Sequence, residues 1–362
     1  MKPLRLSLIS LVAPLLLGCS TSTGTYELNI DVNDYINTLE VTDIDQFSIC
    51  VFNDLHISTL TNLHDEFAYY EKCLLSNGGV TPSLVVLDGD VFMDANKTVV
   101  NRFFSWLDAQ NIPFAYVYGN HDLQGLYSND YIDQRLKQCE HSLLINPLGD
   151  AIFGDSNYVV NISEGGVTKW QLYFFDSNTY YGIHYDVIHD DQIAWYEQEV
   201  SAAPNVPSLT FMHIPTEEFA EAYDELGHHV NSGEITTSGV PGEGSVWYMG
   251  ESISWGYRET SLYETMQQYG QNKAIIVAHD HVNVTDWYYD KDGGSTDNAI
   301  QLIYGLKTGR GIYHDTCVMG ASFYTLSDSG TFDIKWMNVP YEGNPFEITN
   351  DYIVNLGEGA LV

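Results

Sequence analysis

Five short polar blocks carry residue types that bind metal ions, and each block follows an apolar run. The blocks are Asp54-Leu55-His56, Gly89-Asp90, Gly119-Asn120-His121-Asp122, His213 and His279-Asp280-His281. Taken alone, a histidine pair such as the last one is weak evidence in a chain with 12 histidines. Together the blocks contain carboxylates, imidazoles and an amide oxygen, which suit Mn, Fe or Zn and disfavour a pure Mg or Ca site. These groups are numerous enough to hold two adjacent divalent transition metals.

The apolar runs before the blocks are short and almost continuously hydrophobic, which is typical of strands buried on both faces. The predicted strands are 47–52, 84–87, 114–118, 172–175, 209–212 and 274–278. Helix-like segments lie between them at 66–76, 97–109, 130–137, 190–201 and 259–269. The region 299–336 is rich in further strand-like runs. The alternation predicts an α/β fold in which helices cover the sheets.

The position of the blocks is more informative than any single block. They come directly after the first, second, third, fifth and sixth predicted strands. In open α/β sheets, ligands bind at the carboxyl ends of the strands. We therefore expect the five blocks to meet in space, although they are far apart in the sequence.

In this order, the blocks resemble the D-x-H, G-D, G-N-H-D/E, H and H-x-H motifs of the calcineurin-like metallophosphoesterase superfamily. The resemblance covers roughly residues 46–336. Three further segments are similar to its purple-acid-phosphatase-like and yeast cell-cycle phosphatase-related branch, namely His213-Ile214-Pro215, His279-Asp280-His281-Val282-Asn283 and the glycine-rich 304–311. The resemblance implies a four-layer sandwich, in which two mixed β-sheets are flanked by helices.

The resemblance also implies two metal sites that share one carboxylate. Asp54, His56, Asp90 and His281 would bind the first metal, and Asp90, Asn120, His213 and His279 would bind the second. The implied reaction is hydrolysis of phosphate monoesters by a hydroxide that bridges the metals. Phosphodiester hydrolysis at the same centre is the alternative. A binding protein without catalysis is a third hypothesis, which missing ligands would favour, and no ligand is missing.

The roles of His121 and Asp122 are also implied by the resemblance, whereas Lys307 and Arg310 are separate candidates. His121 would contact the phosphate or protonate the leaving oxygen, and Asp122 would orient its ring; a turn or helix cap is the alternative for Asp122. Lys307 and Arg310 are predicted to contact substrate phosphate or else to lie in a solvated turn. Met93 stands where true purple acid phosphatases have a tyrosine ligand, so a ferric first metal and a tyrosinate–iron colour are not expected.

The N-terminus has the pattern of a lipoprotein signal peptide. Lys2 and Arg5 precede an apolar stretch, 6–17, that is too short to span a bilayer comfortably. Leu16-Leu17-Gly18-Cys19 then resembles the lipobox of bacterial lipoproteins. By that resemblance, Cys19 is the lipidated first residue of an exported protein, anchored to the bacterial membrane or cell surface (the outer membrane if the cell has one). An ordinary secretory signal is the alternative.

The predicted domains follow from these segments. They are a signal peptide at 1–18, a tether and lead-in at 19–45, the phosphoesterase domain at 46–340 and a C-terminal tail at 341–362. Within the domain, residues 222–258 have weak periodicity and form either a surface insertion or a lid. Cys50, Cys73, Cys139 and Cys317 are compatible with free thiols and with one or two disulfides.

The charge balance restricts the partners. The chain has 14 Lys and Arg against 49 Asp and Glu, which gives a formal charge of −35. Such a surface repels nucleic-acid phosphate and anionic lipid, so no nucleic-acid binding is expected. A phosphorylated substrate therefore needs a local positive charge, which bound divalent metals would supply.

Overall fold

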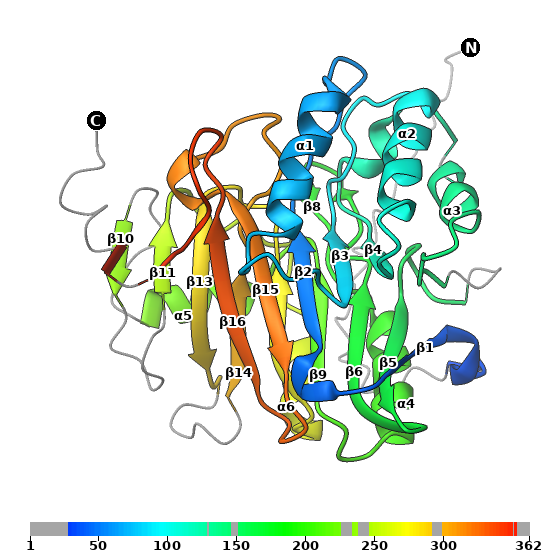
Figure 1. The fold of residues 1–362 in the computed structure, drawn as a ribbon. Coiled ribbons are helices and arrows are strands. Elements are labelled where there is room, and N and C mark those ends of the chain that lie inside the picture. Colours follow the sequence, from blue (N-terminus) through cyan, green and yellow to red (C-terminus); the bar gives the residue numbers. More distant parts are fainter. Residues whose placement is uncertain are drawn as a thin grey trace, which may run out of the picture.

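The computed structural model describes residues 28–128, 130–145, 151–225, 234–237, 246–291, 299–349 and 351–352. In this part of the chain, two large β-sheets pack against each other and helices cover their outer faces (Figure 1). The predicted fold class, two mixed sheets flanked by helices, is therefore confirmed.

The six-stranded sheet combines a parallel half and an antiparallel half. Its strand order is β17-β16-β15-β2-β3-β4. The strands are β2 (Ser48–Phe52), β3 (Leu84–Asp88), β4 (Phe114–Val117), β15 (Gly320–Leu326), β16 (Phe332–Asn338) and β17 (Phe346–Glu347). β2, β3 and β4 are parallel to one another, so their carboxyl ends lie at the same edge. The strands β15 to β17 continue the sheet in antiparallel register on the other side of β2.

The nine-stranded sheet has the order β1-β5-β6-β9-β12-β14-β13-β11-β10. Its strands are β1 (Ile36–Val41), β5 (Tyr158–Glu164), β6 (Val167–Phe175), β9 (Ser208–Met212), β10 (Glu234–Thr237), β11 (Val246–Met249), β12 (Asn272–Val277), β13 (Asn283–Tyr289) and β14 (Ile300–Tyr304). The central strands β6, β9, β12 and β14 are parallel neighbours. A separate hairpin consists of β7 (Tyr180–Tyr181) and β8 (His184–Tyr185).

Helices form the two outer layers. α1 (Leu63–Leu74), α2 (Lys97–Asp108) and α3 (Tyr131–Leu136) lie on the side of the six-stranded sheet. α4 (Asp190–Ala202), α5 (Glu217–Glu225) and α6 (Leu262–Tyr269) pack on the nine-stranded sheet. α2 begins at a typical cap, because the Asn96 side chain accepts hydrogen bonds from the N–H groups of Thr98 and Val99.

The central strands are mostly apolar because both of their faces are covered. In β6, Leu172 and Phe174 belong to the core that contains the six-stranded sheet, whereas Tyr173 and Phe175 pack with α4. Successive side chains of a strand point to opposite faces, so each face needs its own apolar set. This double burial explains why the sequence predicted these strands as short continuous apolar runs.

All six predicted strands and all five predicted helices are present, with shifts at their ends. α5 and several strands, among them β1 and β5, were not predicted. The predicted domain limits remain a prediction, although β1 precedes residue 46 and β17 follows residue 340. The lipobox with Cys19 lies outside the described residues.

The structure bears in part on two other predictions, those for residues 222–258 and for the cysteines. In the region 222–258, β11 pairs with β13 and β10 pairs with β11, so these strands extend the edge of the sheet; residues 226–233 and 238–245 lie outside the described part. Of the two states considered for Cys50, Cys73, Cys139 and Cys317, the structure has free thiols and not disulfides. Among the described residues, no helix has both the length and the apolar character needed to cross a bilayer.

Candidate metal centre

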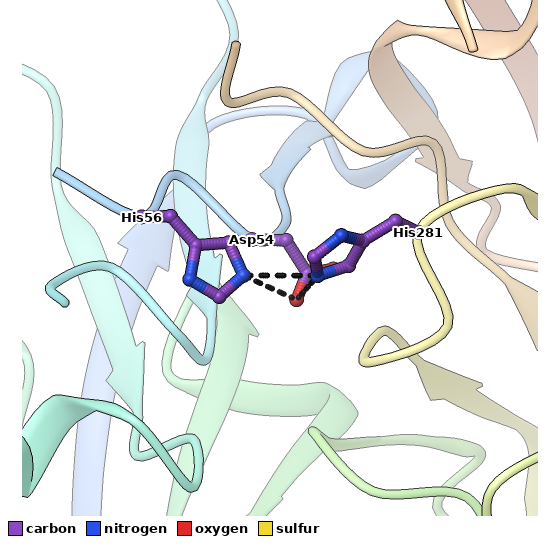
Figure 2. A group of neighbouring side chains, drawn as sticks. All are labelled: Asp54, His56 and His281. Atoms are coloured by element: carbon purple, nitrogen blue, oxygen red, sulfur yellow. Dashed lines mark hydrogen bonds and ion pairs between the residues drawn. The ribbon is translucent and has the colours of Figure 1, made fainter. Parts of the chain in front are cut away.

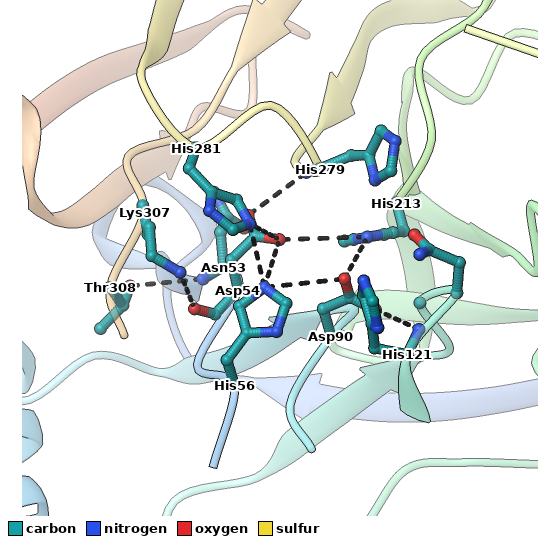
Figure 3. Close-up of polar contacts among 12 residues, drawn as sticks. Asn53, Asp54, His56, Asp90, His121, His213, His279, His281, Lys307 and Thr308 are labelled. Atoms are coloured by element: carbon teal, nitrogen blue, oxygen red, sulfur yellow. Dashed lines mark hydrogen bonds and ion pairs between the residues drawn. The ribbon is translucent and has the colours of Figure 1, made fainter. Parts of the chain in front are cut away.

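The five polar blocks meet at one edge of the sandwich (Figure 3). Three of them follow β2, β3 and β4 of one sheet, and two follow β9 and β12 of the other sheet. The seven predicted ligands are all buried, with His279 the most exposed at 8%. The positional prediction from the strand ends is therefore confirmed, and the site joins both sheets.

The first group consists of Asp54, His56 and His281, whose ligand atoms lie within 4.8 Å of one another. The Nε2 atoms of the two histidines are 2.9 Å apart, and they lie 3.7 Å and 3.5 Å from Asp54 Oδ1. Ligand atoms bound at about 2.1 Å to one metal are roughly 3.0–3.4 Å apart in octahedral or tetrahedral geometry. Figure 2 shows both rings turned towards the Asp54 carboxylate, so the group fits one cation.

The second group consists of Asp90, His213 and His279. Asp90 Oδ2 lies 3.2 Å from His213 Nε2 and 3.7 Å from His56 Nε2. Asp90 therefore stands between the two groups, as a carboxylate shared by two metals must. His213 Nε2 is also 3.9 Å from Asp54 Oδ1, so the two groups form one continuous cluster.

Several polar atoms of the cluster are buried without a hydrogen-bond partner. They include Asp54 Oδ1, Asn120 Oδ1 and His213 Nε2. Leaving such an atom unsatisfied costs on the order of 1–3 kcal/mol, so a partner is expected. All of these atoms are metal-ligand types, and Asn120 donates its Nδ2 to Tyr180 Oη at 3.0 Å, which leaves the amide oxygen as the free end. The orphaned atoms therefore fit bound metal ions.

Backbone carbonyls set the orientation of two imidazoles. His213 Nδ1 lies 3.0 Å from the carbonyl oxygen of Asp88, and His281 Nδ1 lies 3.1 Å from that of Tyr313. A carbonyl only accepts, so each Nδ1 carries a proton and Nε2 is the atom left to bind a metal. In both residues the Nε2 atom is the one that faces the carboxylates.

The ionisation of the cluster matches that of a metal site. Burial lowers the pKa of His56 to about 4 and that of His279 to about 3, so both are neutral at neutral pH. Burial opposes the ionisation of Asp54 and Asp90, but the nearby imidazoles of His281 and His213 hold both carboxyl pKa values below their usual range. Burial likewise opposes the charge of His213, yet the two carboxylates raise its pKa to about 10. A cation bound there would displace that proton.

Four of the candidate ligands have left-handed backbone conformations. Their φ angles are 51° at Asp54, 47° at His56, 50° at Asp90 and 75° at His279. A residue other than glycine costs about 1–3 kcal/mol in this region, and such residues concentrate at functional sites. The concentration of strain in the three loops that carry these residues is an independent mark of function.

Glycines in two of the blocks permit close packing of the loops. A Cβ atom at Gly89 would lie 2.3 Å from Nδ1 of His213, and Gly89 also has a φ of +83°. A Cβ atom at Gly119 would lie 2.2 Å from the backbone nitrogen of Asp90. No larger residue fits either position without moving a ligand, which explains the Gly-Asp and Gly-Asn pairs.

The model of the Calcineurin-like phosphoesterase family matches residues 47–283, a segment that contains all five blocks. The chain belongs to this family. A solved structure of a dimetal phosphatase from Danio rerio shares the fold with a TM-score of 0.52 at 12% identity, and the match covers 84% of this chain and 99% of that one. The predicted superfamily is thereby confirmed by the family match, and the predicted fold by the solved structure.

Two curated relatives agree with the predicted branch. "Probable inactive purple acid phosphatase 29" of Arabidopsis thaliana is 28% identical over 232 residues, which are 56% of this chain and 55% of that protein. "Phosphatase DCR2" of Saccharomyces cerevisiae is 27% identical over 299 residues, which are 74% of this chain and 49% of that protein. The chain thus spans about half the length of these relatives.

In this phosphoesterase, Asp122 does not have the predicted role of orienting the His121 ring. Its carboxylate accepts hydrogen bonds from the N–H groups of Phe92 and Gly119, both at 2.8 Å, and so ties two of the loops together. The ring of His121 is held by Gln124 instead, with 2.8 Å between Nδ1 and Oε1. The buried carboxylate is thus bonded to the backbone of two loops, while the His121 ring is held by Gln124.

The two basic residues of the glycine-rich segment 304–311, Lys307 and Arg310, have different surroundings. Lys307 is 2% exposed, and its ammonium donates to the Asp54 carbonyl oxygen at 2.6 Å (Figure 3). Burial lowers the pKa of Lys307 to about 8. The solvated turn considered for this residue is therefore wrong, and Lys307 supports the backbone of a candidate ligand.

Arg310 points to α1. Its guanidinium pairs with Glu66 at 2.8 Å and lies 5.0 Å and 4.8 Å from the ring centroids of Tyr69 and Tyr341. This arrangement does not agree with the prediction that Arg310 contacts substrate phosphate. The charge of Arg310 is already matched by the partly buried carboxylate of Glu66.

Sequence reasoning missed Gln124 and the tyrosines that contact the ligands. Gln124 lies just beyond the Gly-Asn-His-Asp block, and nothing in its type or spacing distinguishes it from a surface residue. Tyr180, Tyr185 and Tyr313 are three of 26 tyrosines in the chain, so composition could not single them out.

Proposed function

We propose that the protein is a dinuclear metal-dependent phosphoesterase that hydrolyses phosphate monoesters. The observation that carries this proposal is the pair of buried three-residue groups, which adjoin each other at Asp90. In this proposal the first metal is bound by Asp54, His56, Asp90 and His281. The second is bound by Asp90, Asn120, His213 and His279.

When bound, such a metal pair lowers the pKa of water to give a nucleophile at neutral pH and neutralises charge on the phosphoryl oxygens. The residues of the chain prepare the site for it. Asp54 and Asp90 supply two negative charges in a buried setting, and the imidazoles of His56 and His279, neutral at neutral pH, add lone pairs without adding charge. The hydrogen bond from the backbone N–H of His121 to Asp90 Oδ1, at 2.7 Å, fixes the shared carboxylate.

His121 is the proposed general acid or phosphate contact. Its ring lies beside that of His56, with 5.4 Å between the centroids, and it is partly exposed to solvent. Gln124 Nε2 reaches the Asn120 carbonyl oxygen at 3.5 Å, which leaves Oε1 to accept from Nδ1 of His121. In the imidazolium form, the Nε2–H of His121 is then available to a substrate oxygen, either to bind it or to give it this proton, which leaves the neutral imidazole.

The preference for monoesters is tested by kinetics on the purified protein with added Mn²⁺. We expect kcat/KM for phenyl phosphate to exceed that for bis-phenyl phosphate. A bis-ester rate tenfold above the monoester rate would establish the alternative, a phosphodiesterase on the same centre. The absence of turnover of both esters in protein with two bound metals would favour a non-catalytic binding protein.

The metals are proposed to be divalent Mn, Fe or Zn. Met93, three residues after Asp90, cannot supply the phenolate that stabilises a ferric ion in the purple enzymes. Metal analysis is expected to give two ions per chain, and the visible spectrum should lack a charge-transfer band. A coloured protein with a ferric ion would contradict this part of the proposal.

We also propose export and lipid attachment through Cys19, supported by the lipobox-like sequence before it. In the native cell, the wild-type chain should fractionate with the membrane, and Cys19→Ser should release it or leave an unprocessed precursor. Release of both wild type and variant from the membrane, each fully processed, would argue for an ordinary secretory signal.

A further inference from the structure

The hairpin β7–β8 places two tyrosines against the candidate metal ligands. Tyr180 and Tyr185 are directly paired across the hairpin, and their rings stack with 5.4 Å between centroids. Tyr180 Oη accepts a hydrogen bond from Asn120 Nδ2, and the ring of Tyr185 meets that of His279 edge-on at 4.3 Å. This face of the hairpin therefore borders the second metal group, at Asn120 and His279.

The other face of the hairpin has a different environment. Tyr181 pairs with His184 and stacks on Tyr257 at 4.4 Å, and its side chain is 60% exposed. Successive residues of a strand point to opposite sides, so Tyr181 faces away from the metal groups. Tyr181 thus provides a matched control for Tyr180, since both are exposed tyrosines of the same short strand.

A third tyrosine borders the first metal group. The ring of Tyr313 stacks on that of His281, with 4.3 Å between centroids and 27° between planes. Its side chain is still 51% exposed, and Tyr180 is 43% exposed. Aromatic rings therefore border both groups while keeping surface for a further contact, and we call Tyr180, Tyr185 and Tyr313 the aromatic rim.

The charges near the rim disfavour a second anionic group on the substrate. Tyr313 Oη donates to the carboxylate of Glu251 at 2.7 Å. Within the described part of the chain, Arg310 is paired with Glu66, and Arg258 lies 3.8 Å from Asp190. The overall charge of −35 adds to this repulsion.

We propose that the substrates are phosphate monoesters whose leaving alcohol carries a flat, uncharged aromatic ring. This inference rests on the proposed function, because it assumes that the phosphate binds at the two metal groups. The ring of the alcohol would then lie against the aromatic rim, where tyrosine faces favour offset-stacked or edge-on contacts with a planar partner. An arylalkyl group and a nucleobase share this chemistry.

Binding is the direct test, because it does not depend on turnover. Benzylphosphonate and cyclohexylmethylphosphonate differ only in ring aromaticity and shape, and both resist hydrolysis. On the Mn²⁺-loaded protein, calorimetry should give a Kd about 3–10-fold lower for the benzyl compound, the range that one aromatic contact provides. Adenosine 5′-monophosphate against ribose 5-phosphate, as competitors of benzylphosphonate, shows whether a nucleobase meets the same requirement.

Tyrosine variants show which rings cause the difference between the two Kd values. Tyr180→Leu and Tyr313→Leu should each reduce the ratio of the two Kd values towards one, whereas Tyr180→Phe should retain it. Tyr181→Leu, on the outer face of the hairpin, should leave the ratio unchanged. Metal content is measured for every variant, so that loss of the centre is distinguished from loss of the rim.

The two proposals fail in different ways. Equal Kd values for the two phosphonates in the wild type, or a ratio that survives in both leucine variants, would overturn the aromatic-rim inference. The proposed function is judged separately by turnover of benzyl phosphate, and its failure would leave the binding ratio measurable. A benzyl preference that disappears in Tyr181→Leu alone would also contradict the assignment.

Discussion

At the scale of single residues, His121 and Gln124 form the pair most open to experiment. His121→Ala removes the ring but keeps the backbone N–H that donates to Asp90, so both metals should remain bound. We expect kcat to fall by about 10²–10⁴-fold, the usual contribution of a general acid. Unchanged turnover in a variant with two metals would remove His121 from the mechanism.

Gln124 supplies the control for this variant. It holds the ring through one exposed hydrogen bond, so Gln124→Ala should lower kcat by a smaller factor than His121→Ala does. Gln124→Glu keeps an acceptor oxygen at the same position and should retain most of the activity. A larger loss in Gln124→Ala than in His121→Ala would show that the glutamine itself contacts the substrate.

Sequence reasoning assigned Arg310 to substrate binding, whereas the structure gives it a structural role. A variant can distinguish these two roles. Arg310→Met removes the pair with Glu66 and the contacts with the Tyr69 and Tyr341 rings. The free energy of unfolding should fall by about 1–2 kcal/mol, while KM for a phosphate monoester changes less than about twofold. A tenfold rise in KM with unchanged stability would restore the original prediction.

The convergence of the candidate ligands was predictable because each belongs to a short block at the end of a buried strand. Asp54 and His279 needed only the local pattern and the rule that carboxyl ends converge. The role of Asp122 was not predictable, because the choice between an imidazole and two backbone N–H groups depends on how the loops fold. Lys307 and Arg310 are both basic and close in sequence, yet one is buried beside Asp54 and the other pairs with α1.

At the scale of elements, the central parallel strands were predictable and the covering pieces were less so. β6, β9 and β12 are apolar on both faces and therefore stand out in the sequence. α5 was missed because four of its nine residues are glutamates and it begins shortly after His213-Ile214-Pro215. The strands of the β7–β8 hairpin have two residues each, too few to show any alternation.

α4 contains a buried carboxyl group that makes stability depend on pH. Glu199 is 0% exposed, its Oε1 accepts from Trp195 Nε1 at 3.1 Å, and its Oε2 is without a hydrogen-bond partner. Burial raises the pKa of Glu199 from 4.5 to about 8, so the folded chain holds a proton that the unfolded chain releases. This group therefore lowers stability as pH rises from about 4.5 to 8, by at most about 1.4 kcal/mol per pH unit.

Glu199→Gln tests this effect, because an amide keeps the acceptor for Trp195 and cannot ionise. The variant should be more stable than the wild type at pH 8 and nearly equal to it at pH 4.5. Denaturant unfolding at a series of pH values measures the difference. Parallel stability curves for the two proteins would show that Glu199 is ionised in the folded state.

At the scale of the whole molecule, the candidate centre connects two sheets that pack together through a shared apolar core and a few hydrogen bonds, such as those between Tyr158 and the Tyr116 backbone. Loops after β2, β3 and β4 come from one sheet, and loops after β9 and β12 come from the other. Bound metals would act as cross-links at this edge, in addition to stabilising the strained conformations of Asp54, His56 and Asp90. At this edge, left-handed backbone conformations at Asp54, His56 and Asp90 coincide with buried ligand atoms that lack hydrogen-bond partners.

Metal removal should therefore loosen one edge of the molecule and not the whole of it. In the chelated protein, hydrogen exchange should become faster in residues 53–57, 89–92, 119–122 and 279–282, and remain unchanged in α4. The melting temperature should fall as well, because a ligand at 100 times its Kd contributes about 2.7 kcal/mol to stability. Asp90→Asn should exchange like the chelated wild type whether or not Mn²⁺ is added. If exchange became faster evenly over both sheets, metal binding would stabilise the fold as a unit. If chelation did not change exchange, the centre would not connect the sheets.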